Sequence, residues 1–318
     1  MTTGTDNSAH VEIAVVGGGS AGLAAALNLV RARRSVVVID NGEPRNSFAD
    51  GAHGLLGLEG VNPLELLRTG RGEVRSYGAR VVDGRVVEAY ADENGFRVVT
   101  DAGDRLHARQ LVIATGTRDL LPEIPGLADR WGRDAIHCPY CHGWEIRDQR
   151  IALLATGPMS ALQAMMFRQW TDDVTFLPQG LEFPDADHAK LAAANITVDT
   201  RTVIGLDVVA DRLAGVRFAD GTTMPLDVLV VPTFTRARLD GLEGLGLTTS
   251  ESPMGTAVVV DASGHTNVPG VWAAGNVAHP ATQVSEAAAN GTRVAITLNT
   301  ELIFHDTEQK LPGTENNR

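Results

Sequence analysis

The chain has 318 residues, of which 43% are hydrophobic, and a formal net charge of -12. This length predicts two domains, and the apolar fraction is large enough to build two buried sheets. The negative charge argues against binding to nucleic acid or anionic membranes, and no apolar run approaches the length that spans a bilayer. We therefore expect a soluble protein with no nucleic-acid or membrane partner.

The first ten residues are polar and acidic. They lack the basic flank and the apolar core of a secretory signal, so we expect a cytoplasmic location. Reducing conditions there disfavour permanent disulfides.

A dinucleotide-binding unit is predicted at the start of the chain. Residues 11–16 are apolar and β-branched, as expected of a strand buried on both faces, and lead into the GxGxxG spacing of Gly17, Gly19 and Gly22. Residues 23–33 predict a helix and residues 36–39 a second strand. Asp40 ends that strand about twenty residues after the glycines. In such a unit the glycines admit a pyrophosphate at the helix N-terminus, and the acid accepts from a ribose hydroxyl.

Further elements follow along the chain. Apolar strands are predicted at residues 111–114, 151–154, 174–177 and 270–274. Turn-forming runs predict one hairpin over residues 96–111 and another around residues 219–221. Two segments rich in Pro or Gly, residues 119–126 and 234–246, are typical of crossing points between domains.

The only two cysteines, Cys138 and Cys141, are two residues apart and are followed at once by His142. A disulfide across so short a loop removes little unfolded-state entropy, which argues against a structural bridge. Zinc would need a second ligand cluster, haem attachment would need export, and two inert buried cysteines remain an alternative. We favour a reversible dithiol and disulfide without a metal, with His142 exchanging protons with a thiol.

These motifs together resemble the low-molecular-weight thioredoxin reductases. The resemblance rests on the glycine run, on strands that end in Ala114-Thr115-Gly116 and Gly275-Asn276-Val277, and on the Cys-x-x-Cys motif. It implies an α/β fold with two dinucleotide-binding domains, each a Rossmann-like domain with a three-layer ββα arrangement. Residues 1–117 and 246–318 would form the FAD domain, residues 118–245 an inserted, degenerate NAD(P)H-type domain that carries the cysteines, and the protein would be a homodimer.

The second nucleotide fingerprint departs from that family. Residues 155–160 keep one glycine of the set, Gly157, and Pro158 lacks an amide donor. Residues 178–180 read Pro-Gln-Gly where the family has basic residues for the NADPH phosphate. The sequence therefore argues against NADPH, although a divergent nicotinamide site that uses Arg168 or Arg201 stays open.

A narrower resemblance follows from His142, which stands where thioredoxin reductases have aspartate. Imidazole can take a proton from a thiol near neutral pH, whereas an ordinary carboxylate is too weak a base. With the segment at residues 40–46 and the poor NADPH fingerprint, the chain resembles the FAD-dependent dithiol oxidases of the gliotoxin and holomycin pathways. That resemblance implies an intramolecular disulfide closed in a small dithiol, with O2 as acceptor and H2O2 as product.

The resemblance also implies the site residues. It places Cys141 beside the flavin, so a substrate thiolate would attack Cys138 with His142 as base; His279 could be a second base or, like His137, a structural residue. Asn276 replaces the aspartate of the family, which makes its contact neutral. The implied FAD contacts are Gly17, Gly19, Ser20, Ala21, Gly22, Asp40, Asn41, Glu43, Arg45, His53, Val86, Ala114, Asn276, Gln283 and Val284, the last two beginning a helix aimed at the flavin.

Two other functions fit the same motifs. An ordinary disulfide reductase would pass electrons from NADPH or another donor to a thioredoxin-like protein. A flavin-binding redox sensor would use the cysteines without turnover. The natural dithiol would be selected by loops such as residues 51–62.

Overall fold

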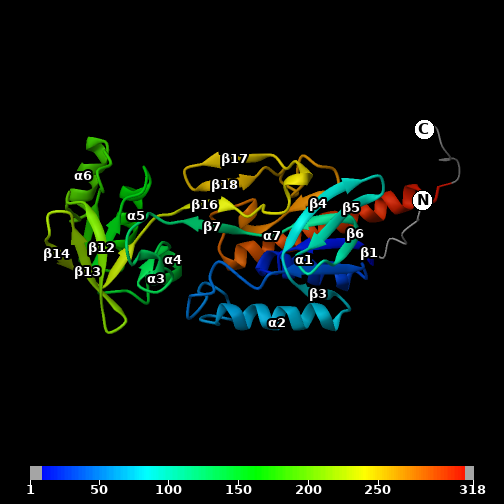
Figure 1. The fold of residues 1–318 in the computed structure, drawn as a ribbon, viewed down its shortest axis with the longest axis horizontal. Helices are drawn as coiled ribbons and strands as arrows, with labels where there is room; N and C mark the ends of the chain where they lie inside the picture. Colours follow the sequence, from blue (N-terminus) through cyan, green and yellow to red (C-terminus); the bar gives the residue numbers. More distant parts are fainter. Residues whose placement is uncertain (1–8, 312–318) are drawn as a thin grey trace.

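The computed structural model describes residues 9–311, so the prediction about the first ten residues lies almost entirely outside the described residues. The described chain forms an elongated molecule with a larger part and a smaller part, joined by strands β7 and β16 (Figure 1). No helix among the described residues is long and apolar enough to cross a membrane.

The larger part is built on a seven-stranded sheet in the order β3-β2-β1-β6-β5-β4, with β19 also paired to β6. Strands β3, β2, β1, β6 and β19 are parallel, and β6, β5 and β4 form an antiparallel meander that confirms the first predicted hairpin. The strands are β1 (Ala9–Val16), β2 (Val36–Asp40), β3 (Arg80–Asp83), β4 (Val86–Asp92), β5 (Gly95–Thr100), β6 (Arg105–Ile113) and β19 (Val271–Ala273).

Two different layers cover the faces of this sheet. Helices α1 (Ser20–Arg31) and α7 (Val284–Glu308) pack on one face with α2 (Pro63–Ser76), and their apolar side chains share a core with Ile13 and Val15. The other face, which includes Ala14 and Val16, packs against a four-stranded sheet in the order β17-β18-β16-β7. Successive side chains of β1 therefore pack into two different cores, one on each face of the sheet. This gives the three-layer ββα arrangement.

The smaller part repeats the same layering. Its five-stranded sheet has the order β11-β10-β9-β15-β8, with helices α5 and α6 on one face and the three-stranded sheet β12-β13-β14 on the other. The β13–β14 pair confirms the hairpin predicted around residues 219–221. The elements are β8 (Ala135–Ile136), β9 (Ile151–Leu154), β10 (Val174–Leu177), β11 (Thr197–Val198), β12 (Val203–Val209), β13 (Arg212–Phe218), β14 (Thr223–Pro225), β15 (Val228–Val230), α3 (Leu127–Arg130), α4 (Pro139–His142), α5 (Ser160–Phe167) and α6 (Asp185–Ala193).

The two segments that join the parts are strands rather than irregular linkers. Strand β7 (Thr117–Leu120) runs antiparallel to β16 (Phe234–Ala237), with Thr117 opposite Ala237. The sheet is completed by β17 (Thr249–Ser252) and β18 (Gly255–Val258), and two short helices, η1 (Glu243–Leu245) and η2 (Gly275–Val277), follow the crossing. Paired crossing strands hold the parts in register more firmly than two free loops would.

The first helix differs from its predicted range. It begins at Ser20, directly after the glycines, and ends before Arg33, whose φ of 65° lies in the left-handed region that stops a helix. Helix α1 therefore starts at the edge where strands β1 and β2 end. This places its first amides at the mouth of the candidate site.

Candidate functional site

One cavity of about 840 Å³ runs between the larger and the smaller part. Its lining comes from the ends of parallel strands β1, β2 and β6, from the loop after β2, from the crossing strands, and from α4 and α5. Carboxyl ends of parallel strands are where α/β sheets bind ligands. The volume falls in the range of small-molecule and cofactor sites.

The glycine turn at the end of β1 is shaped for close contact with a ligand. Gly17 has φ of 105°, and a Cβ there would collide with the carbonyl of Ala114 on the neighbouring strand. A Cβ on Gly22 would collide with the carbonyl of Gly17, so the helix packs directly on the turn. A Cβ on Gly19 would meet nothing within 4 Å, because this residue faces the open cavity. The turn therefore presents bare backbone to a phosphate at the start of α1.

Asp40 closes the same end of the cavity. Its Oδ1 accepts a hydrogen bond from the Gly18 amide at 2.9 Å, and its Oδ2 is paired with Arg71 of α2. A carboxylate has further acceptor positions on each oxygen, so these two partners leave room for a ribose hydroxyl. The predicted role of Asp40 is thus compatible with its contacts, and Arg71 is a partner that no sequence pattern indicated.

Cys138 and Cys141 form a disulfide at the other end of the cavity, with their Cα atoms 5.3 Å apart. Cys138 caps helix α4, and the amide of Cys141 donates to its Sγ at 3.1 Å. Such a bond stabilises a thiolate at Cys138 once the disulfide opens. Among residues 9–311 no group of three or more His, Cys, Asp or Glu side chains could hold a metal ion.

His142, next to the disulfide, lines the cavity with both ring nitrogens buried and without a hydrogen-bond partner in the described chain. Burial lowers its pKa below the ordinary value; nearby Glu145 opposes this effect and His53 adds to it. The ring is therefore mostly neutral at pH 7, with one unprotonated nitrogen.

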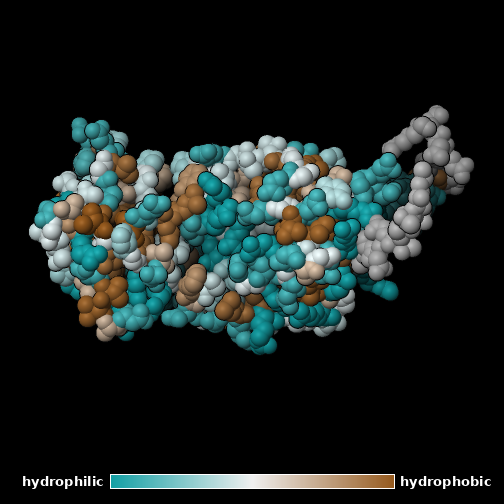
Figure 2. Space-filling view, in the orientation of Figure 1, coloured by the Kyte–Doolittle hydropathy of each residue, from teal (hydrophilic) through white to brown (hydrophobic). Residues whose placement is uncertain are grey.

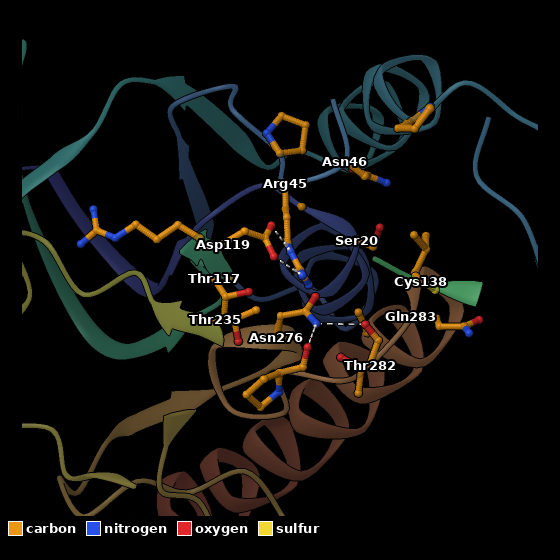
Figure 3. Close-up of a pocket in the computed structure, with 18 of the residues that line it drawn as sticks. Ser20, Arg45, Asn46, Thr117, Asp119, Cys138, Thr235, Asn276, Thr282 and Gln283 are labelled. Carbon is orange, nitrogen blue, oxygen red and sulfur yellow. Dashed lines mark hydrogen bonds and ion pairs between the residues drawn. The ribbon is translucent and has the colours of Figure 1, made fainter. Parts of the chain in front are cut away.

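A buried ion pair ties the loop after β2 to the crossing strands and to the residue before Cys138. Arg45 donates to both carboxylate oxygens of Asp119, at 2.8 and 2.6 Å (Figure 3). Thr233 donates to the same carboxylate at 2.5 Å. Burial would raise the pKa of Asp119, but the hydrogen bonds and charge of Arg45 outweigh it and lower that pKa. Arg45 also reaches the Nε2 of His137 at 3.3 Å. Burial, with Arg45 acting in the same direction, lowers the pKa of His137 to about 4, so this ring is neutral and accepts the bond.

The contacts of Asn276 require an amide rather than a carboxylate at this position. Its Nδ2 donates to the carbonyls of Pro280 and Thr282, each at 2.9 Å, and reaches the carbonyl of His279 at 3.5 Å (Figure 3). A carboxylate cannot donate these bonds. Asn276 therefore fixes the loop that leads to Gln283 and the start of α7, while its remaining oxygen stays available to a ligand in the cavity.

The second glycine-type turn, formed by residues 155–160 after β9, is filled by one of its own side chains, that of Ser160. The amides of Thr156 and Gly157 both donate to Oγ of Ser160, at 3.1 and 3.3 Å, and Ser160 is 1% exposed. The hydroxyl of Thr156 is bonded to the carbonyl of Pro232, and Pro158 has no amide to offer. The donors that would cradle a pyrophosphate are thus already occupied.

The end of β10, where a nucleotide phosphate would be bound, is closed as well. Gln179 pairs through both ends of its amide with the backbone of Val203, at 2.8 and 3.0 Å. Arg168 donates to the carbonyls of Thr171 and Ala194, and Arg201 is paired with Asp199. The two cations that a divergent nicotinamide site could have used are thus engaged elsewhere.

Nearly all the residues predicted for the site line this one cavity. The exceptions are Gly22, which packs behind the turn, and His279, which is half-buried, does not line the cavity and has a pKa lowered by burial and by Arg293. The predicted residues that do line it are Gly17, Gly19, Ser20, Ala21, Asp40, Asn41, Glu43, Arg45, His53, Val86, Ala114, Cys138, Cys141, His142, Asn276, Gln283 and Val284.

Three further lining residues, Asp119, Thr117 and Gln163, were not expected from the sequence. Asp119 was placed in a linker, and only its pairing with Arg45 shows its importance. Thr117 lines the cavity but is only 1% exposed, and its buried hydroxyl has no partner in the described chain. Gln163 of α5 donates to the carbonyl of His137, which ties α5 to the cysteine loop.

Comparisons with known proteins agree with this geometry. The sequence profile of the pyridine nucleotide-disulphide oxidoreductases matches residues 11–292. Thioredoxin reductase tcpT of Claviceps purpurea (strain 20.1) is 32% identical over 278 residues, which is 84% of this chain and 86% of the relative. The crystal structure of HlmI is 40% identical with a TM-score of 0.88, covering 94% of this chain and 95% of that chain. An oxidoreductase from Agrobacterium tumefaciens is 37% identical with a TM-score of 0.87, covering 93% and 99%.

An open glycine turn in one part, a disulfide in the other and a shared cavity define a flavin-type disulfide oxidoreductase with the thioredoxin reductase fold. The chain belongs to the pyridine nucleotide-disulphide oxidoreductase family. Thioredoxin reductase-type members of this family are FAD-binding flavoproteins, and FAD is the cofactor. The resemblance to thioredoxin reductase-like dithiol oxidases that the sequence indicated, the fold class and the enzyme class are confirmed.

Proposed function

We propose that the protein is an FAD-dependent dithiol oxidase that closes an intramolecular disulfide in a small molecule, with O2 as acceptor and H2O2 as product. The observation that carries the proposal is the contrast between the two glycine-type turns. The first turn is open to the cavity at Gly19, whereas the second is filled by Ser160. Electrons would therefore enter through the disulfide and not from a nicotinamide.

In the proposed reaction, His142, Cys138 and Cys141 carry out two successive thiol–disulfide exchange steps. Neutral His142 takes the proton of one substrate thiol, and the thiolate attacks Sγ of Cys138, so the Cys138–Cys141 bond breaks and Cys141 leaves as a thiolate. The second substrate thiol loses its proton and attacks the first substrate sulfur, and Cys138 leaves as a thiolate. The Cys141 amide, which donates to Sγ of Cys138, favours that departure. The substrate has then lost two electrons and two protons: the enzyme holds the electrons as two cysteine thiolates, His142 holds the first proton, and the second proton passes to water.

When bound, FAD would supply the acceptor for the electron pair of the reduced cysteines and the route by which that pair reaches dioxygen, giving hydrogen peroxide. The glycine turn and the first amides of α1 would hold its pyrophosphate, Asp40 its ribose, and the loop fixed by Asn276 the flavin end. The start of α7 at Gln283 and Val284 would direct helix amides at the same end. These cofactor contacts are part of the proposal.

The decisive experiment mixes the purified yellow protein with dithiothreitol in air and follows oxygen uptake and peroxide. We expect steady uptake, one peroxide for each disulfide formed, and no increase on adding NADPH. The variant Cys141→Ser should lose turnover while keeping its flavin. Rapid bleaching of the flavin by micromolar NADPH under anaerobic conditions would overturn the oxidase assignment in favour of a reductase.

Two alternatives make different predictions in the same experiment. A disulfide reductase, as the relative thioredoxin reductase tcpT is named, requires NADPH or another reduced donor. A flavin-binding redox sensor would be reduced by dithiols once and would give no steady peroxide. The filled second turn and the engaged Arg168 and Arg201 favour the oxidase over the NADPH-dependent reductase.

We also propose the domain division predicted from the sequence, with residues 118–245 inserted into an FAD domain made of residues 1–117 and 246–318. The pairing of β7 with β16 supports crossing points at these strands. Leu242 and Leu245 share the core of the larger sheet, which would move the second boundary toward β16. A cytoplasmic location and a homodimer remain predictions; light scattering tests the latter.

A further inference from the structure

We propose that helix α5 forms an apolar wall beside the disulfide and selects dithiols whose body is uncharged and apolar. The wall consists of Met159, Leu162 and Met166. This inference rests on the proposed oxidase function and assigns the residues that choose its substrate. Helix α5, which follows the filled second glycine-type turn, would thus bind the body of the substrate.

The wall lies on one face of α5 and of its N-cap residue Met159, directed at the cysteine loop. Positions 159, 162 and 166 follow helical spacing, and all three residues line the same cavity as Cys138 and Cys141. Gln163, on the same face, donates to the carbonyl of His137, the residue before Cys138. The helix is thereby held next to the sulfur atoms that a substrate must reach.

Two wall residues are exposed although they are large and apolar. Met159 is 50% exposed and Leu162 is 48% exposed, while Phe167 and Ala164 on the opposite face are fully buried in the core. Figure 2 shows other apolar patches on this smaller part of the molecule. What distinguishes Met159 and Leu162 is their place in the lining of the cavity that holds the disulfide. Apolar surface at that position gains free energy when a ligand covers it.

Two observations exclude a nucleotide from this wall and favour an uncharged ligand. Ser160 occupies the turn amides at the start of α5. The cavity lining between residues 131 and 166 includes no Asp, Glu, Lys or Arg. Its two imidazoles, His137 and His142, carry no charge at pH 7. Arg45, which reaches His137, is already paired with Asp119, so a charged substrate body would lose its hydration there without gaining a free partner.

The test compares two dithiols that differ in the polarity of their bodies. Dithiothreitol has a hydroxylated body, and the dithiol of ortho-xylene, with mercaptomethyl groups on adjacent ring carbons, has an apolar one. Both close disulfide rings of the same size. Wild-type protein should favour the aromatic dithiol in kcat/KM. In the Leu162→Glu variant that kcat/KM should fall roughly tenfold, because apolar contact is lost and a charge is added to the wall. The value for dithiothreitol, whose hydroxylated body gains little from an apolar wall, should fall by a smaller factor, so the preference shifts toward dithiothreitol.

The matched control is Leu181→Glu, since Leu181 is 43% exposed on the same part of the molecule and does not line the cavity. It should leave both substrates unaffected, and flavin content should be equal in all variants. Met159→Glu is a second wall variant and should repeat the effect. If the preference between the two dithiols is the same in both wall variants as in wild type, this inference is wrong while the oxidase function stands. If wild-type protein oxidises neither dithiol, the proposed function itself fails.

Discussion

The ion pair between Arg45 and Asp119 is the contact whose removal has the most calculable effect. Asp119 is buried, with a side chain 8% exposed, and its carboxylate accepts three bonds from Arg45 and Thr233. In Asp119→Asn the guanidinium keeps its charge in a partly buried wall beside neutral His137, without a carboxylate. Breaking a buried pair by removing one partner costs about 3–5 kcal/mol. Arg45 is 23% exposed, so we expect the lower end, about 3 kcal/mol.

A double-mutant cycle isolates the pair. Arg45→Met should cost about 2–3 kcal/mol, because it leaves the Asp119 carboxylate buried without its cation. The double variant should cost far less than the sum of the two, with a coupling free energy of about 2 kcal/mol, because neither charge is then left alone. The control is Arg118, a half-exposed neighbour on β7 that is paired with exposed Asp240. Arg118→Met should change stability by less than about 0.5 kcal/mol.

The assay is urea-induced unfolding at fixed flavin concentration, followed by flavin fluorescence and far-UV circular dichroism. Coincident transitions with an unchanged m-value would show that the midpoint shift reports stability. Additive effects of the two single variants, or single effects below about 1 kcal/mol, would refute the reasoning, since the pair would then be screened by water like a surface salt bridge.

Three further predictions follow from the site. His142→Asp should lower kcat with dithiothreitol by about 10²–10³-fold at unchanged flavin content, and the acid limb of the wild-type pH-rate profile should lie below pH 6.5 because burial lowers the pKa of His142; an acid limb above pH 7 contradicts this. The pKa of His137 is about 4 in the native chain and near 6.5 in the unfolded chain. As the pH falls from 7 to 4.5, the unfolded chain therefore binds a proton that the native chain does not, and about 2–3 kcal/mol of stability should be lost. The His137→Gln variant should lose about 2–3 kcal/mol less stability than wild type between pH 7 and pH 4.5, measured from urea midpoints at both pH values. An equal loss of stability in the two proteins would contradict this prediction. Asn276→Asp removes the donor to the carbonyls of Pro280 and Thr282 and should cost about 1–3 kcal/mol, seen as flavin release at lower temperature, whereas unchanged release would show that the loop is held by other contacts.

The elements that could be predicted from the sequence are those specified by local patterns. The first βαβ unit follows from β-branched runs and from glycines whose missing Cβ atoms are required by contacts with Ala114 and Gly17. The disulfide follows from the spacing of Cys138 and Cys141. In each case residues close in the chain determine the geometry, so a pattern in one segment is sufficient.

The contacts that could not be predicted join segments far apart in the chain. Arg45 and Asp119 are separated by 74 residues, and Asp119 lies in a stretch whose two prolines indicated a linker. The strand there forms because residues 117–120 pair with residues 234–237, which no local pattern reveals. In the same way, Asn276 could be recognised as a departure from aspartate, but its bonds to loop carbonyls depend on how residues 279–282 fold back.

The filled second turn has a physical consequence for the smaller part of the molecule. A glycine-type turn without a phosphate leaves backbone amides without an acceptor, and each buried orphan costs about 1–3 kcal/mol. Oγ of Ser160 accepts from both Thr156 and Gly157, so the turn is satisfied without any ligand. The five-stranded sheet can then persist as a scaffold that holds α4 and α5 against the cavity, although it no longer needs a nucleotide to complete it. The turn is therefore complete without a bound nucleotide, and the disulfide keeps its place beside the cavity.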